Sequence, residues 1–92
     1  MPISEIRLQL PYWVDDLIPD PQRLFPTVEE RMELAIALAR RNIASGGGPF
    51  GAAVFDLESG RLIAPGVNLV MPGRCSSAHA EIVALSLAQQ RL

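Results

Sequence analysis

The amino-acid sequence predicts an α/β fold in which one helix, a β-hairpin and a second helix follow one another. Three observations support this order. An apolar pattern of helical period begins after residue 27, two strand-like runs joined by a short turn occupy residues 50–68, and an apolar stretch with a helix-start signal closes the sequence. The 92 residues, 49% of them hydrophobic, suffice for one small domain.

Residues 1–27 are predicted to form a proline-rich arm, and residues 28–92 are predicted to form the domain. Prolines recur through the arm, and each one locks φ and removes an amide donor, so the arm should be mostly irregular. It also carries more apolar side chains than a free tail would; these are Ile3, Ile6, Leu8, Leu10, Tyr12, Trp13 and Val14. We therefore expect the arm to pack along the domain or along a partner chain.

The first helix is expected to begin after Thr27. Thr27 and Glu30 have the spacing of a capping box, in which the two side chains satisfy free amide groups of the first turn. Apolar residues at helical spacing then predict the face that packs on the core; they are Val28, Met32, Ala35, Ile36, Ala39 and Ile43. Gly46 suits the left-handed position just past the end of a helix.

Residues 50–56 and 61–68 are predicted as the strands of the hairpin, with residues 57–60 as the turn. Pro65 lies within the second strand. Because proline cannot donate a ladder hydrogen bond, this strand should have an edge or a bulge at that point.

The second helix is expected from about Ala78 to the end of the chain, with Ser76 or Ser77 as its cap. Its residues are apolar on nearly every side. A helix of this kind is buried between layers or needs a partner.

Charge and composition exclude several classes of partner. The net charge of −2 and the pI of about 5.2 provide no electrostatic footprint for polymeric nucleic acid or an anionic membrane. No apolar run is long enough to cross a bilayer, and the first residues lack the pattern of a signal peptide. Cys75 is the only cysteine, so no disulfide can form within the chain. We therefore expect a soluble, cytoplasmic protein.

Three short stretches carry the functional signal. They are residues 47–52 (GGPFGA), residues 66–68 (GVN) and residues 77–81 (SAHAE). With these motifs the sequence resembles the cytidine deaminase-like superfamily, and within it the bacterial guanine deaminases. The resemblance covers residues 28–92 and implies the N-terminal half of a three-layer α-β-α domain. The activity that it implies is zinc-dependent hydrolytic deamination of a nucleobase, with guanine converted to xanthine and ammonia.

The His-x-Glu pair has a geometric requirement. Residues two apart in the middle of a helix point about 200° away from each other, so they converge only where the chain enters the helix. The preceding serines predict that His79 and Glu81 lie at this place. The resemblance implies that His79 binds Zn²⁺ and that Glu81 is the catalytic proton carrier.

The resemblance also implies the substrate-binding residues. Asn68 would hydrogen-bond the base, Phe50 would stack on it, and the main chain at Ala80 would contact the same ring edge. Two alternatives remain open at these positions. Asn68 is also typical of a strand-ending turn, and Phe50 is also typical of a core aromatic.

The predicted zinc site is incomplete, because the superfamily's P-C-x-x-C motif with its two cysteine ligands does not occur in the sequence. Cys75 precedes His79 and is better interpreted as structural than as a ligand. The expected partners are a small-molecule nucleobase and either a second copy of the chain or a complementary C-terminal half. The alternatives are a non-catalytic fragment that pairs with another chain, or a deaminase for cytosine, a nucleoside or a triazine.

Overall fold

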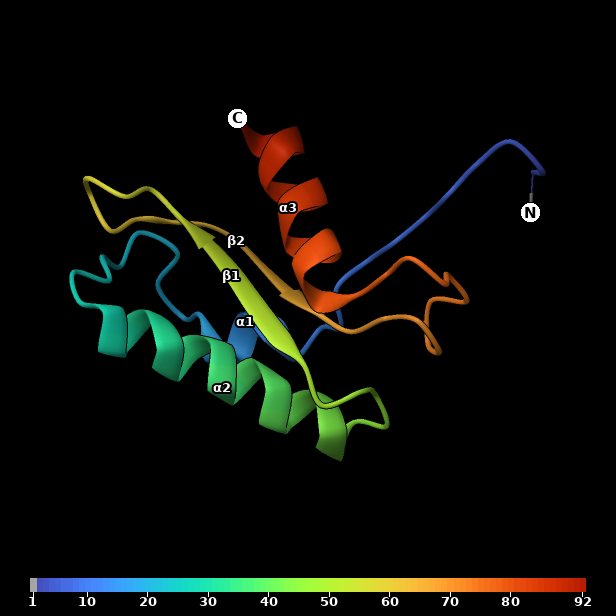
Figure 1. Cartoon of the computed structure of the whole chain (residues 1–92), viewed down its shortest axis with the longest axis horizontal. Helices are drawn as coiled ribbons and strands as arrows, with labels where there is room; N and C mark the ends of the chain where they lie inside the picture. Colours follow the sequence, from blue (N-terminus) through green and yellow to red (C-terminus); the bar gives the residue numbers. More distant parts are fainter. Residues whose placement is uncertain (1) are drawn as a thin grey trace.

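The computed structural model describes residues 2–92, in which a two-stranded antiparallel sheet lies between two helices (Figure 1). The elements in chain order are α1 (Val14–Leu17), α2 (Val28–Ala44), β1 (Gly51–Phe55), β2 (Leu62–Val67) and α3 (Ala80–Arg91). The predicted α/β order of helix, hairpin and helix is therefore confirmed. None of the described helices is both long and apolar enough to cross a membrane.

The pairing register of the hairpin determines which helix covers which face. Gly51 lies opposite Val67, and Ala52 lies opposite Gly66, so the members of each pair point to the same side of the sheet. A Cβ on Gly51 would touch the backbone of α2, whereas a Cβ on Gly66 would touch the backbone of α3. Since neighbouring residues of a strand point to opposite faces, α2 and α3 pack on opposite sides of the sheet.

The predicted pair of Thr27 and Glu30 caps the N-terminus of α2, but only the Thr27 side chain accepts an amide. The Glu30 amide donates to the Thr27 hydroxyl oxygen at 3.1 Å, and that hydroxyl donates to the Glu30 carboxylate at 3.0 Å. The helix ends at Ala44, and Gly46 has a φ of +89°, the left-handed conformation expected there. Both ends of α2 are thus determined by local residues.

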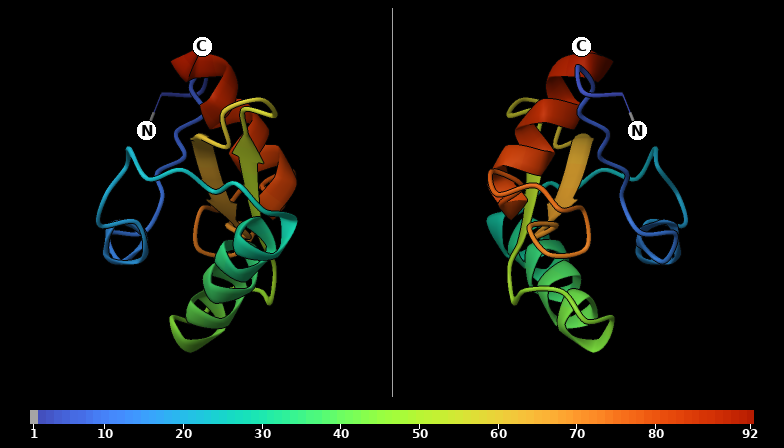
Figure 2. Two further views of the ribbon diagram at one scale, coloured as in Figure 1. Left: turned by 90° about the vertical axis from the view of Figure 1, so that its left-hand side faces the viewer. Right: turned by 90° about the vertical axis from the view of Figure 1, so that its right-hand side faces the viewer.

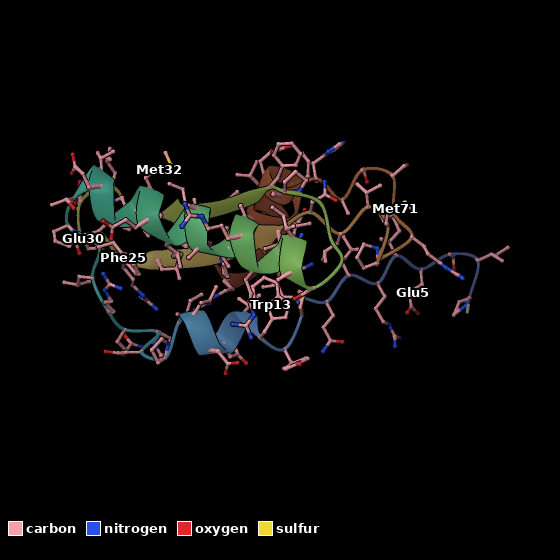
Figure 3. The ribbon with its side chains drawn as sticks, turned by 90° about the horizontal axis from the view of Figure 1, so that it is seen from below. Glu5, Trp13, Phe25, Glu30, Met32 and Met71 are labelled. Carbon is pink, nitrogen blue, oxygen red and sulfur yellow. The ribbon has the colours of Figure 1, made fainter. Side chains whose placement is uncertain are left out.

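The predicted core face of α2 is wrong for its large side chains. The buried residues are Leu34, Leu38 and Asn42. Of the predicted set, Ala35 and Ala39 are half-buried and lie against Gly51. The four larger side chains are exposed, namely Val28 at 68%, Met32 at 55%, Ile36 at 43% and Ile43 at 55%. Figure 3 shows Met32 on the side of α2 away from α1. The helix has apolar residues on two faces, and only the face beside β1 packs on the sheet.

The hairpin strands are one residue shorter at each end than predicted. Asp56 stabilises the turn, because its Oδ1 accepts from the amides of Glu58 and Ser59, both at 2.9 Å. The backbone hydrogen bonds from Ser59 and Glu58 hold the pKa of the Asp56 carboxyl below its ordinary value. Pro65 pairs with Ala53, and β2 has no strand on its other side within residues 2–92, which agrees with the predicted edge.

The predicted serine cap of α3 is also wrong. The helix begins at Ala80 with His79 at the N-cap position, and no side chain caps it. The Ser77 hydroxyl instead forms a hydrogen bond with the Cys75 thiol at 3.4 Å. The Ala78 amide donates to the Cys75 carbonyl at 3.0 Å, so residues 75–78 form a tight turn before the helix starts. This turn delays the helix by two residues and places His79 at its entrance.

The arm packs along the domain, as expected, although Ile3, Ile6 and Tyr12 remain exposed. Trp13, Val14 and Phe25 are buried in the same core as Leu38 and Val67. The amide of Phe25 donates to the Gly60 carbonyl at 2.7 Å. Figure 2 shows α1 to one side of the sheet. The arm therefore contributes side chains to the core although only four of its residues are helical.

Candidate active site

The predicted site residues come from three segments that meet at one end of the hairpin (Figure 1). Phe50 precedes β1, Asn68 follows β2, and His79 to Glu81 begin α3. The amide of Asn68 donates to the Phe50 carbonyl at 3.3 Å. The amide of Leu69 donates to the carbonyl of Ala78 at 2.9 Å, which ties the end of β2 to the entrance of α3. The antiparallel hairpin brings the start of one strand and the end of the other together.

Close packing of β2 on α3 fixes the entrance of the helix. A Cβ on Gly66 would lie 2.3 Å from the Ala80 carbonyl oxygen and 2.6 Å from the Ala84 amide nitrogen. Only glycine allows this approach. Ala80 is accordingly buried, with 1% of its surface exposed. The structure thus holds the main chain at Ala80 directly against the strand that leads to Asn68.

The side chains on either side of Ala80 are accessible. His79 and Glu81 are both exposed, and Phe50 is 59% exposed, so a ligand can reach all three. The exposure of Phe50 does not fit the alternative of a core aromatic. An imidazole and a carboxylate at the first turn of a helix can bind a cation and carry protons beside a substrate.

Asn68 is half-buried and already makes one side-chain hydrogen bond. Its Oδ1 accepts from the Val70 amide at 3.2 Å, which is the local turn geometry typical of asparagine. The amide nitrogen of the same side chain remains as a donor for a ligand. The turn interpretation and the base-binding interpretation of Asn68 are therefore compatible.

Asn42 is a residue of this region that sequence reasoning missed. It is buried, with 2% of its surface exposed, in the last turns of α2. Its Nδ2 donates to the carbonyl of Gly48 at 2.9 Å and to the carbonyl of Asn68 at 3.0 Å. The available signal was its position four residues after Leu38 and eight after Leu34, which places a polar side chain on an apolar helix face.

The donors of this chain do not by themselves fit a zinc ion. Tetrahedral zinc in catalytic sites takes three protein ligands. Within residues 2–92, no group of three or more His, Cys, Asp or Glu side chains could hold a metal ion. The hydrogen bond with Ser77 lowers the pKa of the Cys75 thiol, which is part of the turn before α3. His79 is the residue of this chain that was predicted as a zinc ligand.

Residues 26–91 match the family described as the cytidine and deoxycytidylate deaminase zinc-binding region. The chain belongs to this family. The match confirms the resemblance that the glycine turn, Asn68 and the His-x-Glu pair indicated. The family is described by its zinc binding, and the match includes His79 and Glu81.

Solved structures of similar proteins extend the comparison. The guanine deaminase from Nitrosomonas europaea is 47% identical, with a TM-score of 0.88, and the match covers 99% of this chain and 50% of that one. A protein in complex with 2,6-diaminopurine is 50% identical, with a TM-score of 0.87, and the match covers 96% of this chain and 46% of that one. A mutant of this same protein in complex with 8-azaguanine is 48% identical, with a TM-score of 0.88, and the match covers 99% of this chain and 50% of that one. No match was found among curated protein sequences.

This chain spans about half the length of the solved structures that it matches. Its fold is that of the N-terminal half of a cytidine deaminase-like domain, as predicted. The half present here contains α2, the hairpin and α3.

We expect the isolated chain to lose zinc on dialysis, because only His79 is available from the predicted ligand set. Elemental analysis of the dialysed protein should find far less than one zinc per chain. The variant His79→Ala should then have the same low zinc content as the unsubstituted chain. One tightly held zinc per chain, removed by His79→Ala, would contradict this expectation.

Proposed function

We propose that this chain provides one half of the active site of a zinc-dependent guanine deaminase, which hydrolyses guanine to xanthine and ammonia. One observation carries the proposal. His79 and Glu81 lie at the start of α3. The hydrogen bond from the Leu69 amide to the Ala78 carbonyl joins this helix start to the end of β2, where Asn68 lies. The similarity to a guanine deaminase, and to a protein solved with 2,6-diaminopurine and, as a mutant, with 8-azaguanine, favours a purine over cytosine or a triazine.

The proton chemistry is assigned to Glu81. Its carboxylate takes a proton from the attacking water and delivers protons to the ring nitrogen and to the departing amine, so that guanine and water give xanthine and ammonia. The N-terminal end of α3 carries partial positive charge, and Glu81 lies in its first turn. His79 is proposed as a zinc ligand, and zinc, when bound, lowers the pKa of water.

Three groups are proposed to hold the base. The exposed ring of Phe50 offers an aromatic face for stacking. The Asn68 amide offers a donor to the ring edge. The Ala80 amide belongs to the first turn of α3, whose N–H groups have no acceptor within the helix. We assign it as a further donor for the base, although only 1% of the Ala80 surface is exposed in this chain.

The other zinc ligands must then come from outside residues 2–92, and we propose a complementary C-terminal half as the partner. The length of the similar solved structures supports this choice. So does the surface of the chain, because β1 has an unpaired edge within the described residues and α2 exposes Met32 and Ile36. The remaining candidate is a non-catalytic fragment, which is favoured because no group of three or more possible metal ligands occurs within the described residues.

The organisation and location of the protein are part of the same proposal. Residues 1–27 form an arm and residues 28–92 a partial deaminase domain, which is supported by the five described elements. We place the protein in the cytoplasm, where its single cysteine requires no disulfide partner.

The function is tested on the native assembly, meaning the protein isolated from its own cells with whatever chains accompany it. Guanine, cytosine and adenine are supplied separately, and ammonia release is measured with and without a zinc chelator. Chelator-sensitive release from guanine supports the proposal. Release from cytosine alone would identify a different substrate, and no release from any base by a zinc-loaded assembly would support the non-catalytic fragment.

We also expect the isolated chain to self-associate or to fold poorly, because its apolar surface has no partner. Sedimentation at tens of micromolar should show a dimer or larger species. Ile36→Lys on the exposed face of α2 should reduce this association, whereas Leu57→Lys in the hairpin turn, at a site that is 85% exposed, should not. A sharp monomer peak together with a cooperative thermal transition would overturn the expectation.

A further inference from the structure

We propose that Asn42 is a positioning residue that sets the separation between the two side chains that hold the base, Phe50 and Asn68. This inference rests on the proposed function, since it assigns the base to these two side chains. Asn42 does not contact the base itself. It acts through the main chain of the glycine turn and of the strand end.

The first argument is the pattern of hydrogen bonds. A primary amide has two N–H groups, and both of those on Asn42 are used, one toward the Gly48 carbonyl and one toward the Asn68 carbonyl. The Gly48 carbonyl also accepts the amide of Phe50 at 2.9 Å. The Phe50 carbonyl in turn accepts the amide of Asn68 at 3.3 Å. Four residues therefore form a closed ring of hydrogen bonds, with the Asn42 side chain as the member that comes from another element.

The second argument is the packing around the Asn42 amide. A Cβ on Gly47 would lie 2.5 Å from Asn42 Nδ2, so the glycine turn lies directly against the side chain. A Cβ on Gly48 would lie 3.1 Å from the Cγ of Asn68. The turn, the Asn42 amide and the Asn68 side chain are thus in direct contact. A change at Asn42 is transmitted to both ligand-bearing segments.

Burial makes the arrangement sensitive to the chemistry of this one side chain. Asn42 is 2% exposed, so water does not readily replace a lost donor. Asn42→Asp has the same shape, but it replaces the donor nitrogen by a carboxylate oxygen that faces both the Gly48 and the Asn68 carbonyl oxygens. The two carbonyls should then separate, which widens the space between Phe50 and Asn68.

The experiment measures binding of 8-azaguanine and the kinetics of guanine hydrolysis in the native assembly. We expect Asn42→Asp to weaken 8-azaguanine binding and to raise KM for guanine roughly tenfold to hundredfold, with little change in kcat or zinc content. Asn42→Ser, which keeps one donor, should have an intermediate effect. Ser45→Ala removes a hydrogen bond to the Arg41 carbonyl at the same end of α2 and is the matched control, with binding unchanged.

A double-mutant cycle separates positioning from a purely structural role. In an Asn68→Ala background, Asn42→Asp should raise the dissociation constant of 8-azaguanine by a smaller factor than in the unsubstituted protein, because the positioned Asn68 side chain is gone. An equal factor in both backgrounds, or a lowered melting temperature with unchanged binding, would overturn the proposal. Should Asn42→Asp not fold, Asn42→Ser carries the same comparison.

If the unsubstituted assembly binds no purine, the proposed function is refuted, but the role of Asn42 in holding Phe50 and Asn68 can still be tested. Amide hydrogen exchange of Phe50 and Asn68 should then be faster in Asn42→Ser, while the amides of Asp56 and Gly60 at the far end of the hairpin remain unchanged. Equal exchange at Phe50 and Asn68 in both proteins would show that Asn42 does not hold these segments.

Discussion

Replacing Glu81 by glutamine in the native assembly is expected to reduce guanine turnover by about 10²–10⁴-fold while zinc stays bound. Glutamine keeps the size and the hydrogen-bonding shape of the side chain but cannot accept and release the proton. Because Glu81 is exposed, this exchange should leave the fold intact. Turnover and zinc content are measured on the same samples.

Two controls make the Glu81 result specific. His79→Ala should abolish turnover by removing zinc, so that the two variants differ in metal content although both are inactive. Glu58→Gln, in the exposed hairpin turn, should leave turnover unchanged. Activity of Glu81→Gln within tenfold of the unsubstituted protein would show that another group carries the proton.

The second large effect is expected at Gly66. An added methyl group would lie 2.3 Å from the Ala80 carbonyl oxygen, well inside van der Waals contact and against backbone rather than a flexible side chain. We expect Gly66→Ala to lower the free energy of unfolding by about 3 kcal/mol, or to prevent folding, because the strand and helix must move apart. Movement of α3 would also displace His79 and Glu81, so turnover should fall together with stability.

Urea unfolding of the native assembly measures the effect, and Gly46→Asn is the matched control. A Cβ on Gly46 meets nothing within 4 Å, and asparagine tolerates its left-handed φ. The control should therefore cost only a few tenths of a kcal/mol, as expected for a tolerated turn substitution. A Gly66→Ala protein as stable as the control would mean that β2 and α3 are not packed as closely as the structure shows.

Features that depend on adjacent residues could be predicted from the sequence. The capping box of Thr27 and Glu30 needs only the first turn of a helix, and the left-handed Gly46 needs only the last. The position of His79 and Glu81 on either side of the first residue of α3 is likewise a local feature. In each case the interacting groups are separated by a few residues, so the chain's local geometry is sufficient.

The cap of α3 shows where local signals fail. Two serines precede the helix and either one suits the N-cap position, but the Ser77 hydroxyl bonds the Cys75 thiol. The hydrogen bond from the Leu69 amide to the Ala78 carbonyl anchors this loop on β2. A contact between distant residues therefore decides where the helix begins.

By itself the sequence determined the order of the elements, the family and the identity of the His-x-Glu pair. The tertiary structure decided which face of α2 is buried and which polar residue lies there. Val28, Met32 and Ile36 have the same helical period as Leu34 and Leu38, so periodicity cannot distinguish the two faces. The packing of Gly51 against Ala35, Leu38 and Ala39 places the Leu38 side of α2 on the sheet, and this contact joins segments far apart in the chain.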